Sequence, residues 1–183
     1  TPQPQISLVI MDQSNGHVVA IVGGRGAKEG SRTLNRATDS ARQPGSTFKV
    51  LSTYAPALDS AGMTLATVFN DAPFNYNDGT PVHNWYSNPP YEGLSSIRKG
   101  IYHSMNIVTV KCLTQITPKL GFDYLEDFGF TTLNELNDCY QPMALGGVGG
   151  VTNLELCAAY ATIANGGVYN EPQFYTRVLD SDG

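Results

Sequence analysis

Residues 42–49 have the sequence Arg42-Gln43-Pro44-Gly45-Ser46-Thr47-Phe48-Lys49. Pro44-Gly45 predicts a sharp turn, and the apolar residues between positions 48 and 58 recur at the spacing of a helix. Ser46 and Lys49 would then lie on one face of its first turn. A serine hydroxyl needs a base within hydrogen-bonding distance, and apolar surroundings lower the pKa of a lysine enough for that role. The pattern therefore predicts a nucleophilic Ser46 activated by Lys49.

A second Ser-x-x-Lys pattern, Ser96-Ile97-Arg98-Lys99, shows that this spacing alone has little weight. Ser95 or Ser96 is placed to cap the N-terminus of a helix, and Arg98 beside Lys99 is typical of a solvated face. We expect a structural role here. The first pattern differs in its context, because a turn before Ser46 and an apolar helix behind it would hold its side chains at the wall of a cleft.

Ser104-Met105-Asn106 supplies a second hydroxyl and a carboxamide. It falls at a break between two predicted helices, one from Ser95 or Ser96 to about Ser104 and one over residues 106–116. Residues two apart in a regular helix point in different directions, whereas both can face one cleft at a kink. Ser104 and Asn106 are therefore candidate site residues.

Residues 69–93 show no sustained hydrophobic period and are rich in Pro, Asn, Asp and Tyr. This composition predicts a long ordered loop, because its aromatic residues argue against disorder and long loops in compact domains are often functional. Trp85, Tyr86 and Tyr91 are expected either in the core or on a cleft wall. Trp85 is a candidate substrate-binding residue.

Two β-type runs, residues 6–12 and 17–22, lie near the N-terminus. The Asn15-Gly16 pair between them tolerates the positive φ of a tight turn, so the sequence predicts a β-hairpin. Both runs are nearly continuously apolar, and the hairpin should be covered on at least one face. Residues 23–41 are rich in Gly, Arg and Ser and predict a loop.

Thr152-Asn153-Leu154-Glu155 has the capping-box pattern that opens a helix. We expect this helix over residues 154–164, closed by Asn165-Gly166-Gly167. Residues 174–179 resemble a strand, and residues 180–183 resemble the turn after it. Because folded domains avoid a lone strand edge, we expect a returning strand to follow and the chain to be a fragment.

Composition excludes several classes of protein. The 183 residues carry 11 basic and 16 acidic side chains, and the scattered cations argue against a nucleic-acid partner. No apolar run approaches the roughly 20 residues that span a bilayer, and residues 1–4 lack signal-peptide features, so we expect any membrane anchor outside this chain. Cys112, Cys139 and Cys157 match no zinc-ligand spacing, and Cys112 and Cys157, in apolar helical stretches, are expected to be buried structural residues. No metal or other cofactor is predicted.

Two further patterns favour structural roles. The glycine-rich residues 146–150 lack the Gly-Lys-Ser/Thr ending of a phosphate-binding loop, so we expect a turn. His17, His83 and His103 are not accompanied by a Gly-x-Ser-x-Gly elbow. A serine-histidine nucleophile is therefore not indicated.

Taken in order, the motifs resemble the transpeptidase domain of penicillin-binding proteins, most closely the high-molecular-mass bifunctional class A. The residues that carry the resemblance are 42–49, 104–106, 144–147, 150–155 and 158–167. The resemblance implies an α+β fold of the β-lactamase and D,D-peptidase type, with an antiparallel sheet and a large helical subdomain. Residues 1–23 would form a hairpin of the sheet, residues 41–167 the helical subdomain with the active-site serine, and residues 168–183 the start of a truncated hairpin.

The resemblance also implies roles for four residues. Ser46 would attack the carbonyl between the two terminal D-alanines of a peptidoglycan stem peptide and form an acyl-enzyme, while Lys49 takes the hydroxyl proton. Ser104 would relay a proton to the leaving amine, and Asn106 would bind the substrate amide and help to position Lys49. An amine of a neighbouring stem peptide would complete the cross-link, whereas a β-lactam would leave Ser46 blocked.

The implied setting is the extracytoplasmic face of the bacterial cell membrane. The expected partners are peptidoglycan stem peptides, β-lactams, cell-wall synthesis proteins and the rest of the same polypeptide. The family's third motif, Lys-Thr-Gly on a strand, is absent from this sequence, and the resemblance places it beyond Gly183. The fragment alone is therefore expected to be inactive or weak.

Two alternatives to a transpeptidase remain. A D,D-carboxypeptidase or β-lactamase-type hydrolase would use water to deacylate the enzyme, but the sequence has no obvious carboxylate dedicated to such a water. A non-catalytic penicillin-binding sensor or scaffold domain would bind through the aromatic loop. The intact set of Ser46, Lys49, Ser104 and Asn106 argues against it.

Overall fold

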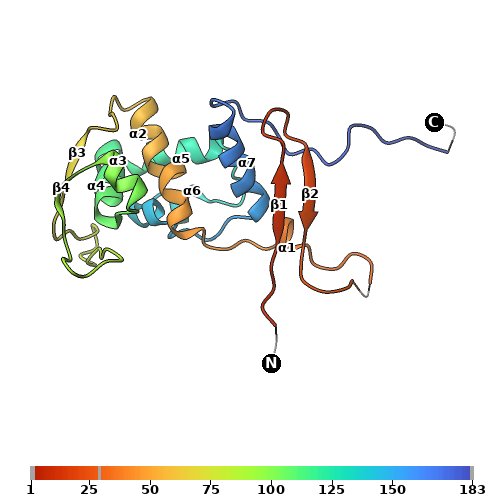
Figure 1. Cartoon of the computed structure of the whole chain (residues 1–183), viewed down its shortest axis with the longest axis horizontal. Helices are drawn as coiled ribbons and strands as arrows, with labels where there is room; N and C mark the ends of the chain where they lie inside the picture. Colours follow the sequence, from red (N-terminus) through yellow and green to blue (C-terminus); the bar gives the residue numbers. More distant parts are fainter. Residues whose placement is uncertain (1–2, 29, 182–183) are drawn as a thin grey trace. The chain divides into compact units, whose positions relative to one another are not determined.

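The computed structural model describes residues 3–28 and 30–181 (Figure 1). The chain forms two compact units. The first comprises the residues up to Arg42, residues 127–132 and the residues from Val151 onward, and the second comprises residues 43–126 and 133–150. All five candidate site residues lie in the second unit. In the described part of the chain, no helix combines the length and the apolar character needed to cross a membrane.

The first unit contains the predicted hairpin. Strands β1 (Leu8–Met11) and β2 (Val18–Val22) pair antiparallel, with Val9 opposite Ile21 and an irregularity after Ile10 (Figure 1). Asp12 orders the turn by accepting hydrogen bonds from the backbone and hydroxyl of Ser14, and Gly16 has the expected positive φ. Helix α7 (Asn153–Ala164) packs on β1. The hairpin prediction is confirmed.

Helix α7 begins at the predicted capping box. Thr152 Oγ1 accepts from the backbone N–H of Glu155, and the Glu155 carboxylate accepts from the backbone N–H of Thr152. The same carboxylate also accepts from the backbone N–H groups of Thr131 and Thr132. The local signal for the helix start is therefore confirmed, and it has a tertiary function that the sequence did not indicate.

Two expectations for the first unit need correction. The predicted loop over residues 23–41 contains a short helix, α1 (Arg36–Asp39), which is capped by the side chain of Asn35. Residues 174–179 form no strand. The nearest pairing is an isolated bridge between His17 and Gln173, because a strand needs a partner edge that local sequence does not supply. The predicted turn over residues 180–183 extends outside the described residues.

The second unit is mostly helical, with one pair of short strands (Figure 1). Its helical elements are η1 (Gly45–Thr47), η2 (Val50–Tyr54), α2 (Ala55–Asp59), α3 (Ile97–Tyr102), α4 (Asn106–Ile116), α5 (Pro118–Asp127), α6 (Glu135–Asp138) and η3 (Gln141–Leu145). Strands β3 (Val68–Asp71) and β4 (Gly93–Ser96) pair antiparallel. The predicted loop over residues 69–93 thus begins and ends in paired strands, a pairing that the sequence did not predict.

The helix that follows Ser46 departs from regular α geometry. It starts as the 3-10 turn η1 and passes into the π-helix η2, where the backbone N–H of Ala55 donates to the carbonyl of Val50. Pro56 has no N–H to donate to the carbonyl four residues earlier, which favours such a departure. π-helical turns occur frequently at functional sites.

The core of the second unit is built on η2 and α4, which pack on each other and on η3. Residues 51–54 of η2 are all buried, and the Tyr54 hydroxyl hydrogen bonds with Thr109 Oγ1 of α4 at 2.8 Å. α5 comes so close that a Cβ at Gly121 would lie 2.3 Å from the carbonyl oxygen of Ser52. This packing fixes the position of the turn that carries Ser46.

Candidate active site

Ser46 lies on an exposed turn that is fixed by close backbone packing. Gly45 has a φ of +59° and starts η1, and Thr47 Oγ1 donates to the carbonyl of Pro44 at 2.7 Å. Gly146, at the end of η3, approaches this turn so closely that a Cβ there would lie 2.4 Å from Gly45 N. The glycine-rich segment is thus a structural turn, as expected, and it also supports the backbone beside Ser46.

Lys49 is buried, with 3% of its surface exposed. Its Nζ donates to Ser104 O at 2.6 Å, to Ser104 Oγ at 3.0 Å and to Asn106 Oδ1 at 2.6 Å. Burial lowers the pKa of Lys49 from its ordinary value to about 8, because desolvation disfavours the charged form. A large share of the side chain is therefore neutral at slightly alkaline pH and able to accept a proton.

Ser104 adopts a left-handed backbone conformation, with a φ of +51°. Its N–H donates to the carbonyl of Ile101, and the N–H of Met105 donates to the carbonyl of Gly100. This is the Schellman pattern that ends a helix, in which the left-handed position is usually a glycine. The predicted break between α3 and α4 is therefore a tight turn, and it directs both the carbonyl and the hydroxyl of Ser104 at Lys49.

Asn106 is the first residue of α4 and has both ends of its side-chain amide bonded. Its Oδ1 accepts from Lys49, and its Nδ2 donates to the carbonyl of His83 at 2.7 Å. The structure thus brings together Lys49, Ser104 and Asn106. In the described residues, no hydrogen bond joins Ser46 Oγ to Lys49 Nζ. Such catalytic contacts commonly tighten only when substrate binds.

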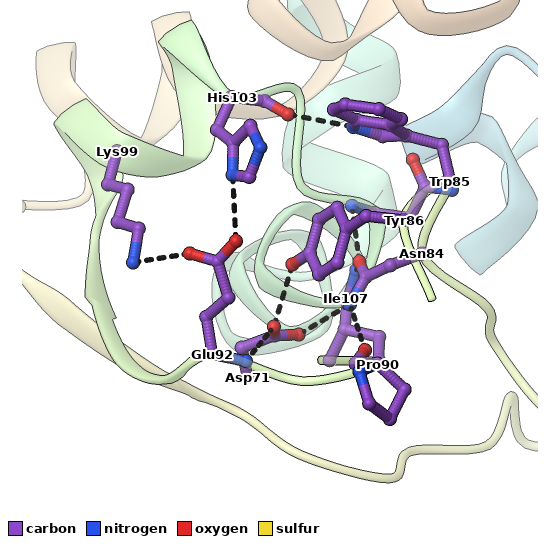
Figure 2. Close-up of polar contacts among 10 residues, drawn as sticks. Asp71, Asn84, Trp85, Tyr86, Pro90, Glu92, Lys99, His103 and Ile107 are labelled. Carbon is purple, nitrogen blue, oxygen red and sulfur yellow. Dashed lines mark hydrogen bonds and ion pairs between the residues drawn. The ribbon is translucent and has the colours of Figure 1, made fainter. Parts of the chain in front are cut away.

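Trp85 is 65% exposed, so it lies outside the core. Its indole N–H donates to the carbonyl of His103 at 2.9 Å, and its ring meets the His103 ring edge to face at 5.3 Å (Figure 2). The Tyr86 ring stacks on the His103 ring with centroids 4.9 Å apart. Trp85 is therefore fixed next to the residue that precedes Ser104.

Three polar residues that the sequence did not nominate, Asp71, Asn84 and Glu92, surround this aromatic group together with His103, for which no role was predicted. Glu92 pairs with His103 Nδ1 at 3.2 Å and with Lys99 at 2.5 Å (Figure 2). Asp and Asn are common in any turn, so their residue types did not indicate a role at the site. The position of His103 directly before Ser104 was the one sequence signal near this group, and it did not by itself indicate a contact.

The second Ser-x-x-Lys pattern has the structural role that we expected. Ser96 is the N-cap of α3, and its Oγ accepts from the backbone N–H of Lys99 at 3.2 Å. Lys99 is a half-buried partner of Glu92, and this contact raises its pKa. The three cysteines are free thiols. In the described part of the chain, no group of three or more His, Cys, Asp or Glu side chains is placed to hold a metal ion.

Comparison with known families decides the origin of this arrangement. The family described as the penicillin-binding protein transpeptidase domain matches residues 6–182. The chain belongs to this transpeptidase family. The resemblance read from the sequence motifs is thereby confirmed, and the relatives are class A proteins of the 1A type.

Penicillin-binding protein 1A of Clostridium tetani is 34% identical to this transpeptidase domain over 99% of the chain. The crystal structure of penicillin-binding protein 1A from Haemophilus influenzae matches with a TM-score of 0.82 and 31% identity, over 98% of this chain and 26% of that one. The structure of PonA1 from Mycobacterium tuberculosis in complex with penicillin V matches with a TM-score of 0.81 and 22% identity, over 97% and 48%. This last likeness concerns the fold.

The chain spans about a quarter of the length of the curated relatives that it matches, 24% for the Clostridium tetani protein. The fold is a mixed helix-and-strand transpeptidase fold in which the sheets are small and fragmentary. The expected α+β class is confirmed at this level.

Proposed function

We propose that this transpeptidase domain forms an acyl-enzyme on Ser46 and cross-links peptidoglycan stem peptides that end in D-Ala-D-Ala. Support comes from the family, whose members are serine D,D-transpeptidases, and from the contacts of Lys49. The observation that carries the proposal is the buried Lys49 amine, with its pKa lowered to about 8, in contact with the hydroxyl of Ser104 and the amide of Asn106.

In the acylation step, Ser46 Oγ attacks the carbonyl carbon between the two terminal D-alanines, and its proton passes to the neutral amine of Lys49. The bond from the carbonyl carbon to the nitrogen of the last D-alanine then breaks. Ser104 Oγ, 3.0 Å from Lys49 Nζ, passes a proton to the leaving amine and recovers one from Lys49. The products are an ester on Ser46 and free D-alanine.

In the transfer step, an amine of a neighbouring stem peptide attacks the ester carbonyl. The amine loses a proton to the Lys49 and Ser104 pair, the bond to Ser46 Oγ breaks, and the serine oxygen is protonated again. Lys49 Nζ and Ser104 Oγ, which lie 3.0 Å apart, would carry the proton from the incoming amine to Ser46 Oγ. General acid-base transfer by such positioned groups contributes about 10²- to 10⁴-fold to the rate.

Two residues are proposed to hold the substrate. Asn106 would hydrogen bond the substrate amide and keep Lys49 in place, and Trp85 would contact the peptide with its exposed ring. Penicillin would acylate Ser46 by opening its lactam ring, as a cyclic amide that mimics the scissile bond. A related structure contains penicillin V.

The proposed setting follows from the relatives, which are penicillin-binding proteins 1A. The domain would act at the extracytoplasmic face of the bacterial membrane, beside other cell-wall synthesis proteins. A Lys-Thr-Gly segment from the rest of the polypeptide would complete the site for the substrate carboxylate.

Intact-mass spectrometry of the full-length protein with benzylpenicillin tests the chemistry. We expect one covalent adduct in the native protein, no adduct in Ser46→Ala and a normal adduct in Ser96→Ala, which removes a matched serine. An adduct that persists in Ser46→Ala would overturn the assignment. Incubation with a D-Ala-D-Ala peptide and an amine acceptor then separates the two reactions, because a transpeptidase yields the amide and a hydrolase only the shortened peptide.

A further inference from the structure

The N-terminus of α4 is capped by a residue far away in the sequence. Met105 occupies the N-cap position and offers no side-chain acceptor. Asn84 Oδ1 instead accepts from the backbone N–H groups of Asn106 at 3.0 Å and Ile107 at 3.3 Å (Figure 2). The first N–H groups of a helix lack partners within the helix, so Asn84 supplies an acceptor that α4 itself does not contain.

Asp71 fixes which way the Asn84 amide points. Asp71 is 1% exposed, and its Oδ1 accepts from Asn84 Nδ2 at 2.8 Å. Its Oδ2 accepts from the Tyr86 hydroxyl at 2.7 Å and from the backbone N–H of Glu92 at 2.8 Å (Figure 2). An ionised carboxylate only accepts hydrogen bonds. The amide nitrogen of Asn84 must therefore face Asp71, which leaves its oxygen for α4.

We propose that Asp71 and Asn84 are positioning residues that hold Asn106 against Lys49. The contacts run from Asp71 to Asn84 Nδ2, from Asn84 Oδ1 to the backbone of Asn106, and from Asn106 Oδ1 to Lys49 Nζ. The hydrogen bonds of Lys49 Nζ go to Ser104 and Asn106, and none joins it to Asp71 or Asn84. The inference rests on the proposed acylation of Ser46 for its effect on rate, whereas the hydrogen-bonded chain itself is independent of that chemistry.

The hydrogen bond between Asp71 and Asn84 can be broken and restored by exchanging the carboxylate of one residue with the carboxamide of the other. Asp71→Asn places an amide nitrogen or a weakened acceptor opposite Asn84 Nδ2, and Asn84→Asp sets a second carboxylate against Asp71. The double variant Asp71→Asn with Asn84→Asp restores the hydrogen bond between the two side chains with its direction reversed, and it loses only the longer contact of Asn84 Nδ2 with the Pro90 carbonyl at 3.3 Å. Its carboxylate at position 84 also faces the N-terminus of α4, where negative charge is favourable. The side chains keep nearly the same shape throughout.

The first measurement is benzylpenicillin acylation of the full-length protein, followed by mass spectrometry over time. We expect the acylation rate constant to fall about 10²-fold in each single variant, as for a small misplacement of a catalytic group, and to recover largely in the double variant. The final adduct amount should stay complete. A merely structural role would instead lower the amount of adduct and leave the rate constant of the folded molecules unchanged, and that result would overturn the proposal.

Val110→Ala is the matched control for stability, because Val110 is buried in the same helix away from its N-terminus. It should lower the Tm while the acylation rate constant stays native. Hydrogen–deuterium exchange in peptides covering Asn106 and Ile107 provides the second measurement. Faster exchange in both single variants, reversed in the double variant, supports the proposal, and unchanged exchange overturns it. If the native protein forms no adduct, the proposed function fails, and the exchange result alone decides the positioning role.

Discussion

Two serine-lysine pairs with identical spacing lie in the second unit and have opposite environments. Lys49 is 3% exposed, and burial lowers its pKa to about 8. The side chain of Lys99 is 31% exposed, and its contact with Glu92 raises its pKa. Ser46 lies on an exposed turn without a capping role, whereas Ser96 caps α3.

The difference shows that spacing places two groups on one face and that burial determines their chemistry. Lys49 is enclosed by segments from elsewhere in the chain, namely the turn at Ser104 and the start of α4. Lys99 meets a carboxylate that stabilises its charge. A lysine of the first kind can act as a base near neutral pH, and one of the second kind cannot.

Replacing each lysine with arginine should produce the largest difference in acylation rate between the two serine-lysine pairs. Lys49→Arg introduces a guanidinium that is not deprotonated in proteins, so we expect acylation by benzylpenicillin to slow by about 10²- to 10⁴-fold. Lys99→Arg keeps the charge beside Glu92 and should acylate at the native rate. Stopped reactions analysed by mass spectrometry give both rates. Equal acylation rates in the two variants would show that the two lysines do not differ in function.

Gly146→Ala should show that the turn at Ser46 depends on backbone packing. The new Cβ would lie 2.4 Å from Gly45 N, and φ at Gly146 is +76°. We expect a stability loss of about 2–5 kcal/mol from the left-handed conformation and the overlap, and acylation slowed by about tenfold.

Gly79→Ala is the control for this variant, because Gly79 has a φ of +86° and no atom within 4 Å of the added Cβ. It should lose only about 1–2 kcal/mol and acylate normally. Thermal melts and acylation time courses measure both effects. Native acylation in Gly146→Ala would show that the contact with Gly45 does not support the nucleophile.

The pH dependence of acylation should follow Lys49 and not Lys99. The neutral form of Lys49 accumulates as the pH rises through about 8, so the acylation rate should fall about tenfold per pH unit below that value. Lys99 has its pKa raised and stays charged over this range. Rates measured from pH 6 to 9 give the profile. A rate independent of pH would exclude Lys49 as the proton acceptor.

The smallest effect is expected from Ser96→Ala. It removes the N-cap of α3, which costs about 1 kcal/mol of stability, and should leave acylation unchanged. Denaturant unfolding measures the loss. A strong decrease in acylation would mean that the second pair contributes to the site.

The sequence predicted those elements whose signals are local. Asn15-Gly16 marked the hairpin, Thr152 and Glu155 marked the start of α7, and the break at Ser104 separated α3 from α4. The pairing of β3 with β4 was missed because it joins short segments more than 20 residues apart. The predicted strand over residues 174–179 failed for the same physical reason, since a strand forms only where another edge accepts it.

The candidate site divides in the same way. Ser46, Lys49, Ser104 and Asn106 belong to short motifs, so the sequence could nominate them, although their roles stay predictions. Asp71 and Asn84 were not nominated, because their function depends on contacts with residues 13 and 22 positions away. Burial of an acceptor-only carboxylate is a property of the folded chain, and residue type alone does not reveal it.

The left-handed backbone at Ser104 has a consequence for the trade between stability and activity. A non-glycine residue in this conformation costs roughly 1–2 kcal/mol, and helix ends of this kind usually carry glycine. Glycine at this position would relieve that strain at a chain-entropy cost of about 0.5–1 kcal/mol. The substitution would also remove the hydroxyl that accepts a hydrogen bond from the buried Lys49 amine, and leaving such a group without its partner costs about 1–3 kcal/mol. The backbone strain at Ser104 is therefore offset by the contact that holds its hydroxyl beside Lys49, at the residue where a proton carrier is needed.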